Sequence, residues 1–104
     1  MAFNDMGTEQ ENFSDISEKI DEPSLFKVLL HNDDYTTMDF VVDILIEVFS
    51  KTEYEAEKIM LNIHNKGIGV CGVYVYEIAE TKVETVLALA EANGFPLKST
   101  MEKA

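Results

Sequence analysis

The residues with the clearest chemical potential lie in one short run, in which an amide and two carboxylates follow an apolar segment. Asn32, Asp33 and Asp34 place several acceptor oxygens within three residues. No Lys or Arg directly flanks them, so they could receive a cation with several donors, either an ammonium group or a metal ion. The structural interpretation competes with this one, because Asn and Asp are common turn formers and Thr36 or Thr37 can serve as a helix N-cap.

A second polar side chain, His64, stands near the end of a predicted helix. Its spacing of four residues from Met60 puts the two side chains next to each other on the helix surface. If this helix returns antiparallel to the one before it, His64 approaches Asn32 and Asp33, and Met60 approaches Met38. The structural alternative is a surface or capping histidine at a helix end.

Hydrophobic spacing predicts the elements that must position these residues. Three strands are predicted, over residues 26–30, 70–76 and 97–102. Three helices are predicted, over residues 38–50, 53–66 and 78–92. Thr52 and Glu55 form a capping-box pattern, and Gly67 is the expected left-handed stop of the second helix. The inward stripe predicted for the third helix is Ala79, Val83, Val86, Leu87 and Ala90.

This β-α-α-β-α-β order predicts a small α+β two-layer sandwich. Three helices would pack on one face of a three-stranded antiparallel sheet. Each predicted helix has a single dominant apolar stripe, which is what a one-sided helical layer requires.

The chain divides into two parts of different composition. Residues 1–24 carry seven acids against one lysine and few apolar side chains, which predicts a flexible acidic extension. Residues 25–104 are predicted to form one domain, since 104 residues with 46% hydrophobic side chains support one modest core. The extension is either a solubilising tail or a peptide that engages a partner.

Charge and cysteine content restrict the function classes. The formal net charge is −12 and the chain has no Arg, which argues against nucleic acid and against anionic membrane surfaces. No apolar run reaches the roughly 20 residues that span a bilayer, and no signal peptide is recognisable. The lone Cys71 fits a reducing cytoplasm. One Cys and two His are too few for a structural zinc site, so no cofactor is expected, and the partner is expected to be cationic or a protein.

Four segments of the chain resemble the ClpS family, the adaptors that deliver N-degron substrates to the ClpAP or ClpCP protease. These segments are Val28–Val41, Met60–His64, Gly69–Val73 and Glu77–Val83. The resemblance extends from about Phe26 to Glu102 and implies the same α+β sandwich. It implies a non-enzymatic cytoplasmic adaptor whose partner is the N-terminal domain of a ClpA- or ClpC-type ATPase. Its substrates would be proteins and peptides that begin with Leu, Phe, Tyr or Trp.

The resemblance also implies roles for individual residues. Asn32, Asp33 and His64 would hold the free α-amino group of the substrate. An ammonium has three N–H donors, and an amide oxygen, a carboxylate and a neutral imidazole nitrogen offer three acceptors. Met38 would be the gate residue that crowds β-branched side chains. The side-chain pocket would consist of Asp34, Thr36, Met38, Val41, Met60, Ile63 and Leu97.

The implied ATPase-facing surface is at the start of the third helix, where Glu77 and Lys82 match the family. The acidic extension matches a variable N-terminal segment that engages the ATPase. In one departure, the family commonly has proline where this chain has Thr37. Because proline would fix the first helical turn, the loop is predicted to be looser in this chain.

Two other function classes compete with the adaptor. A metal-dependent hydrolase would use His31, Asp33, Asp34 and His64. Alternate residues of an extended segment point in opposite directions, so Asp34 would not share a face with His31 and Asp33, and no nucleophile is identifiable. A ribosome- or complex-associated α+β domain would explain the fold but not Asn32, Asp33 and His64 together.

Overall fold

The computed structural model describes residues 22–104, so most of the predicted acidic extension lies outside the described residues. The described part contains the predicted order of three strands and three helices, which confirms the fold class. The elements are β1 (Leu25–His31), α2 (Met38–Glu47), α3 (Glu53–Lys66), β2 (Ile68–Val75), α4 (Tyr76–Ala92) and β3 (Lys98–Lys103). Within residues 22–104, no helix is long and apolar enough to cross a membrane.

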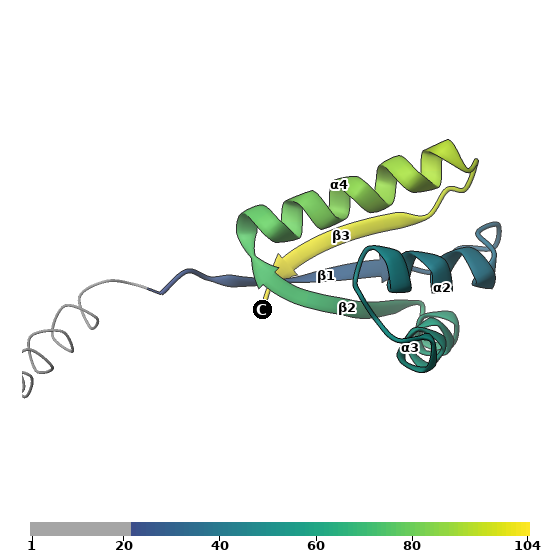
Figure 1. Cartoon of the computed structure of the whole chain (residues 1–104), viewed down its shortest axis with the longest axis horizontal. Helices are drawn as coiled ribbons and strands as arrows, with labels where there is room; N and C mark the ends of the chain where they lie inside the picture. Colours follow the sequence, from purple (N-terminus) through teal and green to yellow (C-terminus); the bar gives the residue numbers. More distant parts are fainter. Residues whose placement is uncertain (1–21) are drawn as a thin grey trace, which may run out of the picture.

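The sheet has β1 at its centre, in the order β2-β1-β3, and both strand pairs are antiparallel. Helix α4 runs along the sheet, whereas α2 and α3 pack together at the end where β1 finishes (Figure 1). The pairing of β1 with β2 shifts between Val28 and Leu29, because Cys71 is an extra residue on β2. Such a bulge bends the strand locally and increases its twist.

The hydrophobic core lies between the helices and one face of the sheet. Val28 and Leu30 point from β1 into a cluster that also contains Ile44 and Leu45 of α2, and all four side chains are essentially inaccessible to solvent. Helix α4 contributes Ala79, Val86 and Ala90 as buried residues, with Val83 packed against them.

The prediction that Leu87 belongs to this stripe was wrong, because 40% of this residue is exposed. The buried positions of α4 follow a spacing of four, three and four residues. Leu87 lies one position beyond Val86, about 100° around the helix, and therefore points away from the sheet.

Side-chain caps define the start of both short helices. Thr37, rather than Thr36, is the N-cap of α2, and its hydroxyl oxygen accepts a hydrogen bond from the Phe40 backbone N–H at 3.1 Å. The capping box of Thr52 and Glu55 is present as predicted. Each cap satisfies an N–H group that the first helical turn leaves without a partner.

The ends of these helices fit the prediction unequally. Gly67 ends α3 with the predicted left-handed conformation at φ 89°. Helix α2 ends at Glu47, before the predicted Ser50, because Ser50 itself adopts a positive φ of 57°. A side-chain donor from α4 takes the Val48 carbonyl oxygen at this end, since Lys82 Nζ lies 2.7 Å from it.

Candidate functional site

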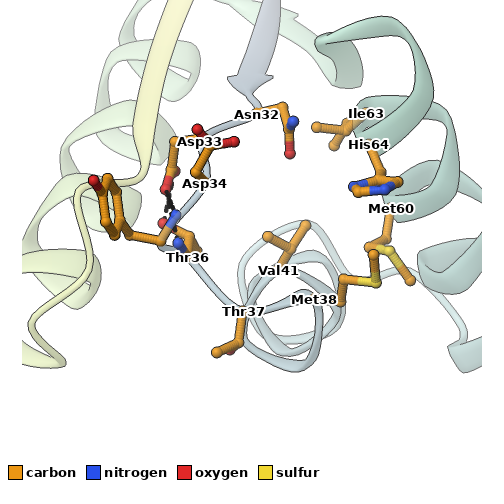
Figure 2. A pocket seen from close by; sticks show the side chains of 11 residues that line it. Asn32, Asp33, Asp34, Thr36, Thr37, Met38, Val41, Met60, Ile63 and His64 are labelled. Atoms are coloured by element: carbon orange, nitrogen blue, oxygen red, sulfur yellow. Dashed lines mark hydrogen bonds between the residues drawn. The ribbon is translucent and has the colours of Figure 1, made fainter.

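A cavity of about 370 Å³ lies between the loop after β1 and the facing surfaces of α2 and α3 (Figure 2). This volume falls in the range of small-ligand pockets. Nine of the ten residues predicted to bind the substrate line it, and these are Asn32, Asp33, Asp34, Thr36, Met38, Val41, Met60, Ile63 and His64. The structure therefore brings the loop and the second helix together, as the predicted antiparallel helix pair requires.

The tenth residue, Leu97, is not among the residues that line the cavity. It is 4% exposed and belongs to the hydrophobic core cluster, immediately before β3. Two lining residues, Tyr35 and Thr37, were not predicted as site residues. Their position inside the loop between Asn32 and Met38 was the signal that could have identified them.

The polar end of the cavity is formed by side chains from β1 and α3. Asn32 follows the last residue of β1, and its backbone N–H donates to the Gly67 carbonyl oxygen at 2.9 Å. Gly67 is the C-cap of α3, three residues after His64. This bond ties the end of the strand to the end of the helix, so that the Asn32 amide and the His64 imidazole reach the same space (Figure 2).

The apolar part of the cavity comes from one pair of side chains on each helix. Met38 and Val41 project from α2, and Met60 and Ile63 project from α3 (Figure 2). Val41 and Ile63 are buried and form the floor, whereas Met60 is half-buried and Met38 is 44% exposed. Methionine is unbranched and polarizable, so a rim of this kind can adapt to apolar groups of different shape.

The Asp33 carboxylate holds the loop that borders the cavity. Its Oδ1 atom accepts hydrogen bonds from the backbone N–H groups of Tyr35 at 2.8 Å and of Thr36 at 2.7 Å. Its Oδ2 atom accepts from the Thr36 hydroxyl at 2.7 Å. Partial burial acts to raise the pKa of Asp33, but these hydrogen bonds outweigh it and hold the pKa below its ordinary value. The turn-forming interpretation of Asp33 is therefore correct, and the carboxylate is also a negative charge at the cavity.

The arrangement supports binding rather than hydrolysis. His31 does not line the cavity, and its Nε2 atom lies 2.7 Å from the Thr100 hydroxyl of β3. Cys71 is buried, and this burial raises the pKa of its thiol to about 12, so the thiol is not an activated nucleophile. Among residues 22–104, no group of three or more His, Cys, Asp or Glu side chains is arranged to hold a metal ion.

The two residues predicted to face an ATPase lie on α4, away from the cavity. Glu77 is exposed in the first helical turn. Lys82 is half-buried, because its ammonium group donates to the Val48 carbonyl oxygen and lies 5.6 Å from the centre of the Tyr74 ring. Lys82 thus fastens the end of α2 to α4, a role that the sequence did not reveal.

Comparisons with known proteins agree with one another. A family model described as the ATP-dependent Clp protease adaptor protein ClpS matches residues 21–100. The ClpS adapter of Desulfatibacillum aliphaticivorans is 62% identical over 86 residues, which cover 83% of each chain. That of Desulforapulum autotrophicum is 55% identical over 103 residues, or 99% of each chain.

Among solved structures, Agrobacterium tumefaciens ClpS2 bound to L-phenylalaninamide has the same fold. It superposes with a TM-score of 0.77 at 40% sequence identity. The match covers 80% of the present chain and 100% of the ClpS2 chain.

Proposed function

The chain belongs to the ClpS family of ATP-dependent Clp protease adaptors, and from this premise we propose that it selects substrates by their first residue. It binds proteins and peptides that begin with Leu, Phe, Tyr or Trp and passes them to a ClpA- or ClpC-type ATPase. The observation that carries this proposal is the two-part cavity, in which hydrogen-bond acceptors and an apolar floor adjoin within about 370 Å³.

The polar end fits a chain terminus. Asn32, Asp33 and His64 offer an amide oxygen, a carboxylate and an imidazole nitrogen, which match the three N–H donors of an α-ammonium group. An internal peptide nitrogen carries no charge and at most one N–H, so it would leave acceptors without partners, at a cost in binding free energy. Specificity for chain ends follows from this mismatch.

The apolar end fits the side chain of the first residue. Val41 and Ile63 form its floor, with Met38 and Met60 at the rim, and the exposed Met38 is placed to crowd a branch at the β-carbon of the substrate. Asp34 and Thr36 complete this subsite on the loop side. L-phenylalaninamide, the ligand of the Agrobacterium protein, combines a free amine with one bulky side chain, which is the chemistry that this cavity suits.

Delivery requires a second surface. We assign it to Glu77 and Lys82 on α4, against the N-terminal domain of the ATPase, and we divide the chain into an extension of residues 1–24 and an adaptor domain of residues 25–104. A single cysteine, Cys71, suits the reducing cytoplasm in which a Clp protease would receive such substrates.

A degradation assay tests the proposal. Matched reporter proteins that begin with Leu, Phe, Tyr, Trp, Val or Glu are offered to a ClpA-type ATPase and its protease, with and without the adaptor. We expect the adaptor to accelerate degradation of the first four reporters only. Equal acceleration of all six reporters, or acceleration that survives replacement of Asn32 by alanine, would contradict the proposal.

A further inference from the structure

The face of the sheet opposite the helices is not covered by any element of residues 22–104, and it is apolar along β2. Residues paired across antiparallel strands point to the same side. Leu25 pairs with Val75, and Leu29 pairs with Val70, on the side away from the core residues Val28 and Leu30. The apolar members of this open face are Leu25, Leu29, Ile68, Val70, Val73 and Val75.

These side chains are accessible to an unusual degree for β-branched residues in a strand. The exposed fractions are 40% for Ile68, 44% for Val70, 46% for Val73 and 37% for Val75, and Leu25 is 48% exposed. A contiguous apolar surface of this kind on a small domain generally marks a place where something else packs.

The open face is also the least acidic part of an acidic chain. Lys27 pairs with Val73, His31 with Ile68, and Lys98 with His31, so two lysines and a histidine share this side of the sheet. Glu102, paired with Lys27, is the one carboxylate on this face among the described residues. The molecule as a whole has a formal charge of −12, so the face attracts a negatively charged occupant that carries apolar anchors.

The N-terminal extension has this chemistry and begins at the right place. Phe13, Ile16 and Ile20 recur with a spacing of three and four residues, which puts them on one side of a helix. Residues 1–21 contain six carboxylates and one lysine. The chain enters the fold at Leu25, which is itself a residue of the open face, so Ile20 is only five residues away.

The reach is sufficient. The eight residues of β2 span about 26 Å at about 3.3 Å per residue. Residues 13–24 form a chain of twelve residues, which covers that length even when part of it is helical.

We propose that residues 13–20 fold back over the open face and place Phe13, Ile16 and Ile20 against the valines of β2. Tethering favours this occupant, because a short linker gives an effective concentration in the millimolar range. A second copy is disfavoured, because both molecules are strongly acidic and their lysines would face each other. This contact replaces a uniformly flexible extension and shields the apolar strand from other proteins.

A nitroxide label on the extension of the full chain tests the contact. Asn12→Cys accepts the label selectively, because Cys71 is buried and its thiol pKa is raised to about 12. We expect the label to broaden the methyl signals of Val70, Val73 and Val75 at least twofold more than those of Ile78 and Leu89 on α4. Equal broadening of both groups, or none, would overturn the proposal.

Two matched variants and one mixing control complete the test. The triple substitution of Phe13, Ile16 and Ile20 by serine should abolish the selective broadening, whereas Met6→Ser, which lies outside the spacing, should preserve it. Added salt should weaken the broadening through its charge component. In an equal mixture of labelled chains and isotope-labelled chains, selective broadening should disappear, and its persistence would show that a second copy covers the face instead.

Discussion

Replacing Asp33 by asparagine separates two roles of one carboxylate. The structure shows Asp33 holding its loop through three hydrogen bonds, from two backbone N–H groups and the Thr36 hydroxyl. We propose that the same group contributes the negative charge that attracts the ammonium of the substrate. Asparagine retains an oxygen for the backbone donors, and its amide can donate to the Thr36 hydroxyl, so the loop is kept while the charge is lost.

The expected magnitudes follow from the hydrogen-bond inventory. A hydrogen bond that involves a charged group contributes about 1.5–3 kcal/mol, and a neutral one about 0.5–1.5 kcal/mol. Asp33→Asn should therefore cost about 1–1.5 kcal/mol of binding free energy, which is roughly a tenfold increase in Kd. Asp33→Ala should cost more in binding, and it should also lower the free energy of unfolding by about 1–2 kcal/mol, comparable to the loss of a helix cap.

The assay is fluorescence anisotropy with a Leu-initial peptide labelled at its C-terminus, combined with thermal unfolding of each variant. Thr52→Ala serves as the control, because it removes a capping box away from the cavity and should reduce stability by about 1 kcal/mol without changing Kd. If Asp33→Asn binds as tightly as the parent chain while Asp33→Ala does not, the carboxylate only anchors the loop. Our assignment of its charge would then be wrong.

The lowered pKa of Asp33 adds a prediction with a definite sign. A carboxyl group whose pKa is lower in the folded state stabilises the fold above its ordinary value, given as 3.8, and this stabilisation is lost as the pH falls through the lower folded value. The parent chain should therefore lose stability relative to Asp33→Asn only below about pH 4. A difference between the two that changes between pH 7 and pH 5 would contradict this account.

Three further perturbations address other residues. Peptide binding should weaken when the solution is acidified into the range where histidine side chains titrate, because a protonated imidazole has no acceptor, and His64→Gln should flatten this dependence while Asp33 stays ionised. Met38→Ala should improve binding of Val-initial relative to Leu-initial peptides by about 1–3 kcal/mol, and an unchanged preference accompanied by a large fall in Tm would show that Met38 packs the core instead. Lys82→Met should lower the free energy of unfolding by about 1–2 kcal/mol, because it removes the donor to the Val48 carbonyl, while leaving peptide affinity unchanged in titrations.

Much of the fold could be predicted from local rules. The capping box at Thr52 and the left-handed Gly67 set the bounds of α3 to the residue, because both signals act within one turn. The end of α2 could not be predicted, since it depends on Ser50 and on Lys82, which lies 34 residues after Val48. The placement of Leu87 failed for a related reason, because the rotation of a helix about its axis is decided by the sheet beneath it.

The site could be predicted in outline from residue types and spacing. Asn32 and His64 were expected to meet because an antiparallel helix pair requires it, and the bond from Asn32 to Gly67 fixes their approach. Leu97 was assigned to the cavity by resemblance alone, and in this chain it packs in the core. The use of both Asp33 oxygens within the loop depends on dihedral angles that no spacing rule contains.

The central claim is that the cavity recognises a free chain terminus together with its first side chain. Isothermal titration with a Leu-initial peptide and its N-acetylated twin tests this most directly, because the two differ only in the charge and donors of one nitrogen. We predict saturable one-to-one binding of the free peptide and a loss of at least a hundredfold in affinity for the acetylated one, which corresponds to about 2.7 kcal/mol. Equal affinity for both peptides would contradict the account.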